Sequence, residues 1–150
     1  MNTRRDIEGF VAQKTLAIVG MSRAPQSFSA NAAKELKAKG YRILPVNPNA
    51  AEIQGEKCYP SLAALPEKVG GVLFLTPPAA TEKALREAVE AGLAHFWIQQ
   101  GADSPEAIHF CKEKNLSAVT GHCILMFAEP VGYFHKIHRF FKGLFGGLPK

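Results

Sequence analysis

The sequence predicts an α/β protein with a Rossmann-like, doubly wound parallel sheet. Short apolar segments typical of buried strands alternate along the chain with segments of helical periodicity. Gly, Pro and Asn end most of the apolar segments, as expected where a strand reaches the surface. Because such alternation requires right-handed crossovers, we expect helices on both faces and a strand order of 3-2-1-4-5-6, with strand 3 short.

The first half of the chain contains the first three expected strands. A leading helix is expected over 6–13, where apolar residues recur at helical spacing. The continuous apolar run 16–19 is the first strand, and a helix follows that begins near Ser29, a residue type that caps helices. A second strand is expected over 41–46. A short third strand is expected over 57–59, within an otherwise irregular stretch.

The second half continues the same alternation. A buried strand is expected over 71–75, followed by a helix over 79–91 that a glycine ends. The next strand is expected over 94–98. The helix after it is expected to have Ser104 as its cap and a proline at its first helical position. A last strand is expected over 117–120. All the strands then run in the same direction, with their carboxyl ends at one edge.

The turn after the first strand is a candidate anion site. Gly20 ends that strand, and a loop of small and polar residues leads to the helix near Ser29. The N-terminal N–H groups of such a helix and the positive end of its dipole point at the turn, so phosphate is the expected ligand. Taken alone, this motif is equally consistent with Gly20 serving only to turn the chain.

The nucleotide motifs that are absent narrow the ligand class. The NAD fingerprint G-x-G-x-x-G is missing, and the second strand ends at Asn47 where an acidic residue would hold the ribose hydroxyls. This disfavours NAD. The Walker A pattern is also missing, which excludes ATP hydrolysis by that route.

Length and composition indicate one domain, over 1–150, with a core at about 14–123 and a C-terminal extension at 124–150. Its 47% hydrophobic and 21% charged residues are ordinary for a globular protein. No apolar run is long enough to span a bilayer and no signal-peptide core is seen, so we expect a cytoplasmic protein. Cations that follow Glu129 account for most of the net charge of +5, which argues against nucleic-acid binding by the body of the protein.

The cysteines and histidines do not form a recognisable reaction centre. Cys58, Cys111 and Cys123 are far apart and odd in number, and their spacing to histidines is too sparse for a zinc site. His122 and Cys123 are adjacent, but neighbours in a strand point to opposite faces. We therefore expect no catalytic residues and no metal site. An enzyme that uses Cys58 or Cys123 remains the alternative.

Several short motifs occur in an order that resembles the small single-domain CoA-binding protein family. The match extends from about 15 to 123, and its fold resembles the CoA-binding domain of the succinyl-CoA synthetase α subunit. The motifs are VGMS at 19–22, PVNPN at 45–49, GEKCYPS at 55–61, TPP at 76–78 and WIQQGA at 97–102. The synthetase's phosphorylated histidine belongs to a second domain that this sequence lacks, so the resemblance does not imply ligase chemistry.

The resemblance implies a set of CoA-binding residues at the carboxyl edge of the sheet. The turn would hold the pyrophosphate, the end of the second strand would line the adenosine, the loop after 75 would follow the nucleotide or pantetheine arm, and the loop after 98 would border the far side. The residues are Gly20, Met21, Ser22, Arg23 and Ser29 for the turn and helix, Val46, Asn47 and Pro48 for the second strand, and Thr76, Pro77, Pro78, Gln99 and Gly101 for the later loops.

The function expected from the sequence is binding of coenzyme A or an acyl-CoA, without catalysis. One alternative is a nucleotide-dependent transferase or reductase that uses a cysteine near the site. The other depends on the tail, where aromatic and aliphatic residues form an apolar stripe over 133–145 among basic residues. Such a stripe fits a terminal helix that packs on the sheet or across a homodimer interface, and it also fits attachment to a membrane surface.

Overall fold

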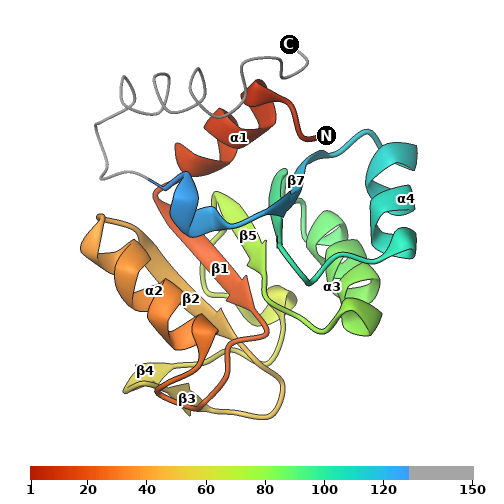
Figure 1. Cartoon of the computed structure of the whole chain (residues 1–150). Helices are drawn as coiled ribbons and strands as arrows, with labels where there is room; N and C mark the ends of the chain where they lie inside the picture. Colours follow the sequence, from red (N-terminus) through yellow and green to blue (C-terminus); the bar gives the residue numbers. More distant parts are fainter. Residues whose placement is uncertain (129–150) are drawn as a thin grey trace.

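The computed structural model describes residues 1–128, which fold around a parallel sheet of five strands (Figure 1). The order across the sheet is β2-β1-β5-β6-β7, and every neighbouring pair is parallel. The α/β, Rossmann-like fold class predicted from the sequence is confirmed. The strands are β1 (Thr15–Val19), β2 (Arg42–Val46), β5 (Gly71–Phe74), β6 (His95–Gln99) and β7 (Ser117–His122).

Helices cover both faces of the sheet, because successive strand residues alternate between two apolar clusters. One cluster joins Ile18 and Trp97 to α1 (Arg4–Val11), α2 (Phe28–Ala38) and the 3₁₀ helix η2 (Ile124–Met126). The other joins Ala17 and Phe96 to the opposite helices. These are α3 (Pro78–Glu90) and α4 (Pro105–Glu113), with the 3₁₀ helix η1 (Leu62–Ala64). The packed core therefore extends beyond residue 123, while the predicted tail stripe lies outside the described residues.

Within residues 1–128, no helix is long and apolar enough to cross a membrane.

The expected third strand is reduced to a single bridge beside β2. Tyr59 pairs with Val46, its N–H donates to Pro45 O at 3.0 Å, and its carbonyl accepts from the N–H of Asn47 at 2.9 Å. The carbonyl of Pro45 thus faces away from β1, toward the position of a third strand. The nitrogen of Pro45 faces the same way but carries no hydrogen, so it cannot donate to such a strand. A full strand could not pair there, because proline is tolerated only at a sheet edge.

A small hairpin replaces the irregular stretch expected over 51–60. Its strands β3 (Glu52–Ile53) and β4 (Glu56–Lys57) are antiparallel, and Gln54 and Gly55 form the turn with φ of 53° and 78°. Positive φ at both central residues suits the twist of a two-residue hairpin. Ile53 anchors the hairpin in the core, where it is 2% exposed.

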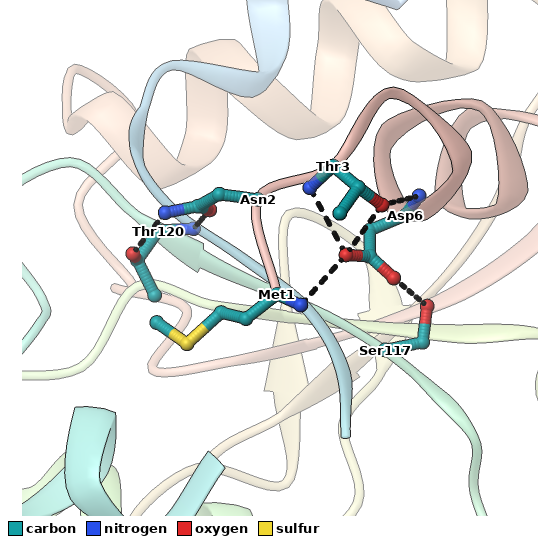
Figure 2. A network of polar contacts seen from close by, with 6 residues as sticks. All are labelled: Met1, Asn2, Thr3, Asp6, Ser117 and Thr120. Carbon is teal, nitrogen blue, oxygen red and sulfur yellow. Dashed lines mark hydrogen bonds and ion pairs between the residues drawn. The ribbon is translucent and has the colours of Figure 1, made fainter. Parts of the chain in front are cut away.

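The N-terminal residues cover the other edge of the sheet, along β7 (Figure 2). The N–H of Asn2 donates to Ala118 O at 2.9 Å, and its side chain exchanges hydrogen bonds with the N–H and hydroxyl of Thr120. Asp6 accepts hydrogen bonds from Thr3 and from the Ser117 hydroxyl, and the Met1 ammonium lies 2.9 Å from its Oδ2. Edge backbone groups of β7 are thereby satisfied within the chain.

Candidate functional site

The carboxyl ends of β1 and β5 meet at the point where the strand order reverses, which is where open α/β sheets bind ligands. Gly20 follows β1 with φ of 92°. A Cβ atom at this position would lie 2.8 Å from the carbonyl oxygen of Leu75 and 3.0 Å from the nitrogen of Thr76. Gly20 thus allows the loops after β1 and β5 to touch, in addition to turning the chain.

Two serines hold the loop between β1 and α2. Ser27 caps the helix, and its Oγ accepts from the N–H of Ala30 at 3.2 Å. Ser29 is 6% exposed, and its Oγ accepts from the N–H of Ser22 at 2.9 Å. The helix begins at Phe28, within one residue of the expected start near Ser29, but its cap is Ser27 and not Ser29. The Ser29 side chain is used to hold the loop.

Asn47 connects the end of β2 to the same loop. Its Nδ2 donates to the carbonyl oxygen of Met21 at 2.7 Å, and its Oδ1 accepts from the N–H of Asn49 at 2.8 Å. The side chains of Met21 and Val46 are 2% and 3% exposed and pack in the two apolar clusters. These three residues position the backbone at the site, while Pro48 is exposed beside them.

The loop after β5 is fixed by a chain of hydroxyl groups. The Thr81 hydroxyl donates to the carbonyl oxygen of Ala102 at 2.6 Å, and it lies 2.6 Å from the hydroxyl of Thr76. Because the proton of Thr81 is used on Ala102, Thr76 is the donor in the contact between the two threonines. The loops after β5 and β6 are therefore connected through α3. Pro77 and Pro78 are exposed where that helix begins.

The far side of the edge is closed by the segment after β7. Gln99 is 6% exposed, and its Oε1 accepts from the N–H of Ile124 at 3.0 Å. The carbonyl oxygen of His122 accepts from Trp97 Nε1 at 3.0 Å, and burial lowers the pKa of the His122 side chain. Gly101 has φ of 92° and no atom within 4 Å of where a Cβ would lie, so its surface is open.

The hairpin forms a wall of the site that the sequence reasoning missed. Gln54 Nε2 donates to the carbonyl oxygen of Arg23 at 3.3 Å, which connects the hairpin turn to the loop after β1. A cavity of about 380 Å³ lies between the hairpin and α2, and Met21 is part of its lining. The dipeptide Gln54-Gly55 is the sequence signal for this turn, although glutamine is less typical there than asparagine or aspartate.

Further hollows lie elsewhere on the described surface. One of about 490 Å³ lies between the N-terminal ends of α3 and α4, near Pro78 and Ser104. A larger one of about 810 Å³ lies between 61–68 and the C-terminal half of α3, away from the carboxyl ends of the strands. The volume of a hollow therefore does not by itself identify the candidate site, which lies where the strand order reverses.

The cysteines differ in their surroundings. Cys58 is 3% exposed, and its Sγ lies 3.7 Å from the carbonyl oxygen of Asn47. Burial raises the pKa of the Cys58 thiol, and burial raises that of Cys111 to about 11. Cys123 is half-buried. Among the described residues, no three His, Cys, Asp or Glu side chains are grouped to hold a metal ion.

Comparison with known proteins shows which family the chain belongs to. Residues 14–129 match the family model described as a CoA binding domain. The chain is 32% identical over 111 residues to the uncharacterized protein YneT of Bacillus subtilis, covering 74% of this chain and 82% of that one. It is 31% identical over 103 residues to an ADP-forming acetate–CoA ligase II of Archaeoglobus fulgidus, covering 67% of this chain but only 15% of the ligase.

Solved structures agree with the sequence comparisons. A conserved hypothetical protein from Pyrococcus furiosus superposes with a TM-score of 0.71 at 39% identity, covering 75% of this chain and 97% of that one. A hypothetical protein from Pyrococcus horikoshii superposes with a TM-score of 0.74 at 31% identity, covering 81% and 86% of the two chains. The resemblance stated from the sequence is confirmed, and the chain belongs to the CoA-binding domain family.

Proposed function

We propose that this protein binds coenzyme A or an acyl-CoA at the carboxyl edge of its sheet, and that it does so without catalysis. The diphosphate lies against the loop 20–27 and the N-terminus of α2. The nucleotide and the pantetheine arm extend from there along the ends of β2 and β5. The residues proposed to form the site are those that the family resemblance implies.

The observation that carries the proposal is the N-terminus of α2 at the reversal of strand order. The Ser27 cap engages the N–H of Ala30, and other N–H groups of the first turn have no acceptor within the helix. The loop is already held by the contact from Ser22 N–H to Ser29 Oγ, so little ordering is needed when an anion binds. Arg23 is exposed on this loop and adds a positive charge.

The relatives support the ligand but not a reaction. The matched ligase from Archaeoglobus fulgidus has CoA in its name, and the aligned region is a small part of it. Ligase activity is therefore not part of the proposal. An enzyme that uses Cys58 is also disfavoured, because burial of this thiol raises its pKa and the thiolate is the nucleophile.

Calorimetric titration and thermal unfolding with CoA, ADP and NAD test the proposal. We expect the melting temperature to rise by a few degrees at saturating CoA, less with ADP, and not with NAD. Arg23→Gln should lower the affinities for CoA and for ADP by a similar factor of about 3 to 10. Lys14→Gln removes the same charge just before β1, at the opposite edge of the sheet, and should leave both affinities unchanged. Absence of any CoA binding by the unmodified protein would refute the proposal.

A further inference from the structure

The hollow of about 810 Å³ beside the C-terminal half of α3 has an apolar floor that is open to solvent. It lies at the amino edge of the sheet, because 61–68 precedes β5 and α3 ends before β6 begins. Within its lining, Leu65 is half-buried, and Ala63, Pro66 and Ala91 are exposed. Pockets of roughly 300–1,000 Å³ enclose a drug-sized molecule, so several side chains of one protein segment can fit here.

The rim of this hollow is acidic. Among the described residues, its lining contains three glutamates and one lysine, which are Glu67, Glu87, Glu90 and Lys68. Glu67 forms an ion pair with Arg42, whereas no ion pair found among residues 1–128 uses Glu87 or Glu90. These two carboxylates lie near the C-terminal end of α3, whose last turn contains no basic residue. Negative charge there is unfavourable, because it meets the negative end of the helix dipole. Lys68 can offset only one of them, so a further cation at the rim would be stabilising.

The sequence contains a segment with the complementary pattern. The apolar residues of the stripe predicted over 133–145 are Phe134, Ile137, Phe141, Leu144 and Phe145. The basic residues Lys136, Arg139 and Lys142 occur among them, and no acidic residue follows Glu129. On a helix, these cations would flank or oppose the apolar stripe. An amphipathic helix of this kind places its apolar face in a groove and its charges at the rim. The apolar floor and the acidic rim of the hollow match both features.

The described part of the chain ends at the same edge of the sheet as the hollow. The carbonyl oxygen of Ala128 accepts a hydrogen bond from Lys39 Nζ at 2.9 Å. Lys39 caps the C-terminus of α2, and three residues later Arg42 begins β2 and pairs with Glu67 of the hollow. Three residues span at most about 11 Å. Residues 129–132 can span about 14 Å when extended, and a helix over the predicted stripe would add about 20 Å. The hollow is therefore within reach of the segment in the same molecule.

We infer that the hollow beside α3 is the docking site for the C-terminal segment 133–145 of the same chain. The apolar stripe packs on the floor at Ala63 and Leu65, and the basic residues approach Glu87 and Glu90. The hollow lies at the edge of the sheet opposite the proposed CoA site, so this contact goes beyond the proposed function and does not depend on it. Because the segment is tethered, the contact is intramolecular and does not require a high protein concentration.

Carbodiimide cross-linking of the full chain, followed by peptide mass spectrometry, tests this placement. The reagent joins a carboxylate directly to an amine, so Lys136 or Lys142 should become linked to Glu87 or Glu90. An equal mixture of unlabelled and isotope-labelled protein distinguishes links within a chain from links between chains, and we expect links within a chain. The inference is wrong if these lysines link only to other carboxylates, only to a second chain, or to no carboxylate.

Two adjacent alanines provide a matched pair of variants. Ala63 and Ala64 are both exposed and belong to η1, but only Ala63 lines the hollow. Ala63→Lys adds bulk and positive charge to the floor, so it should release the segment and accelerate tryptic cleavage after Lys136 and Arg139 at least several-fold. Ala64→Lys adds the same side chain outside the lining and should leave the cleavage rate unchanged. Equal cleavage rates in the two variants would overturn the inference.

The two rim carboxylates can also be neutralised together. Glu87→Gln combined with Glu90→Gln should accelerate the same tryptic cleavage several-fold, because the segment loses its acidic partners. If the segment does not dock here, the double variant only removes unfavourable charge from the end of α3. A higher melting temperature with an unchanged cleavage rate would therefore show that these carboxylates do not hold the segment.

Discussion

The Oγ of Ser29 accepts a hydrogen bond from the backbone N–H of Ser22 at 2.9 Å, across the loop that precedes α2. The same hydroxyl lies 3.1 Å from that of Ser27, which caps the helix. A single buried serine thus connects the candidate phosphate-binding loop to the helix whose N-terminus faces it. The shape of this loop is set before any ligand arrives.

Ser29→Ala should loosen the loop. The N–H of Ser22 would lose its acceptor, so we expect the free energy of unfolding to fall by about 1 kcal/mol. CoA affinity should fall several-fold, because binding must then order the loop. Urea denaturation and calorimetry measure the two effects. Ser61→Ala is the control, since Ser61 makes no side-chain cap, and unchanged stability in Ser29→Ala would contradict the role assigned to this serine.

Gly20→Ala should be considerably more destabilising than Gly101→Ala. Both glycines have φ of 92°, so each alanine carries a similar backbone strain of about 1 kcal/mol or more. The Cβ at position 101 has open space, whereas that at position 20 would lie 2.8 Å from Leu75 O and force the loops apart. We expect Gly20→Ala to lose at least about 2 kcal/mol in urea denaturation. Equal losses would show that only φ matters at Gly20.

Stability should decrease in acid through Asp6. Burial acts to raise the pKa of this carboxyl, but hydrogen bonds from the N-terminal ammonium, Thr3 and Ser117 outweigh it, and the pKa lies below the usual 3.8. The unfolded chain therefore binds the proton first as the pH falls. The contribution of Asp6 to the free energy of unfolding is therefore complete at pH values above the pKa of the unfolded chain. It is lost as the pH falls through the lower pKa of the folded protein.

The comparison of Asp6→Asn with the unmodified protein isolates this effect. The difference in unfolding free energy between the two should be largest near pH 6 and should shrink below about pH 4, as the carboxyl of the unmodified protein becomes protonated. Urea denaturation at a series of pH values measures it. A difference that stays constant from pH 6 to pH 3 would show that the carboxylate charge is not what stabilises this network.

Thiol reactivity should follow burial in the order Cys123, then Cys58 and Cys111. Cys123 is half-buried, whereas the other two are buried and their thiol pKa values are raised, to about 11 for Cys111. Because the thiolate is the reactive form, labelling of the folded protein near pH 8 should modify Cys123 first. Peptide mass spectrometry after timed alkylation identifies the sites. Rapid labelling of Cys58 would revive the alternative of an enzyme that uses this cysteine.

Local sequence was sufficient to predict most of the helices and strands. The buried strand ending at Gly20, the glycine itself and the helix after it follow from apolar runs, turn residues and cap types, all of which act within a few neighbours. The hairpin was missed because Gln54 is an uncommon residue at positive φ, although Gly55 beside it was a signal. The sequence also contained a signal that β2 lies at the edge of the sheet, because the nitrogen of Pro45 cannot donate a hydrogen bond to a further strand.

By itself, the sequence determined the alternation of buried strands and helices, because periodicity and turn chemistry are local properties, and the order of its short motifs determined the family. Only the tertiary structure decided where the polar side chains at the carboxyl edge point. Asn47 turns to Met21 O and Gln99 turns to Ile124 N. The partners in these bonds are 26 and 25 residues apart in the chain, and a buried polar group takes whichever partner the packed fold brings within reach.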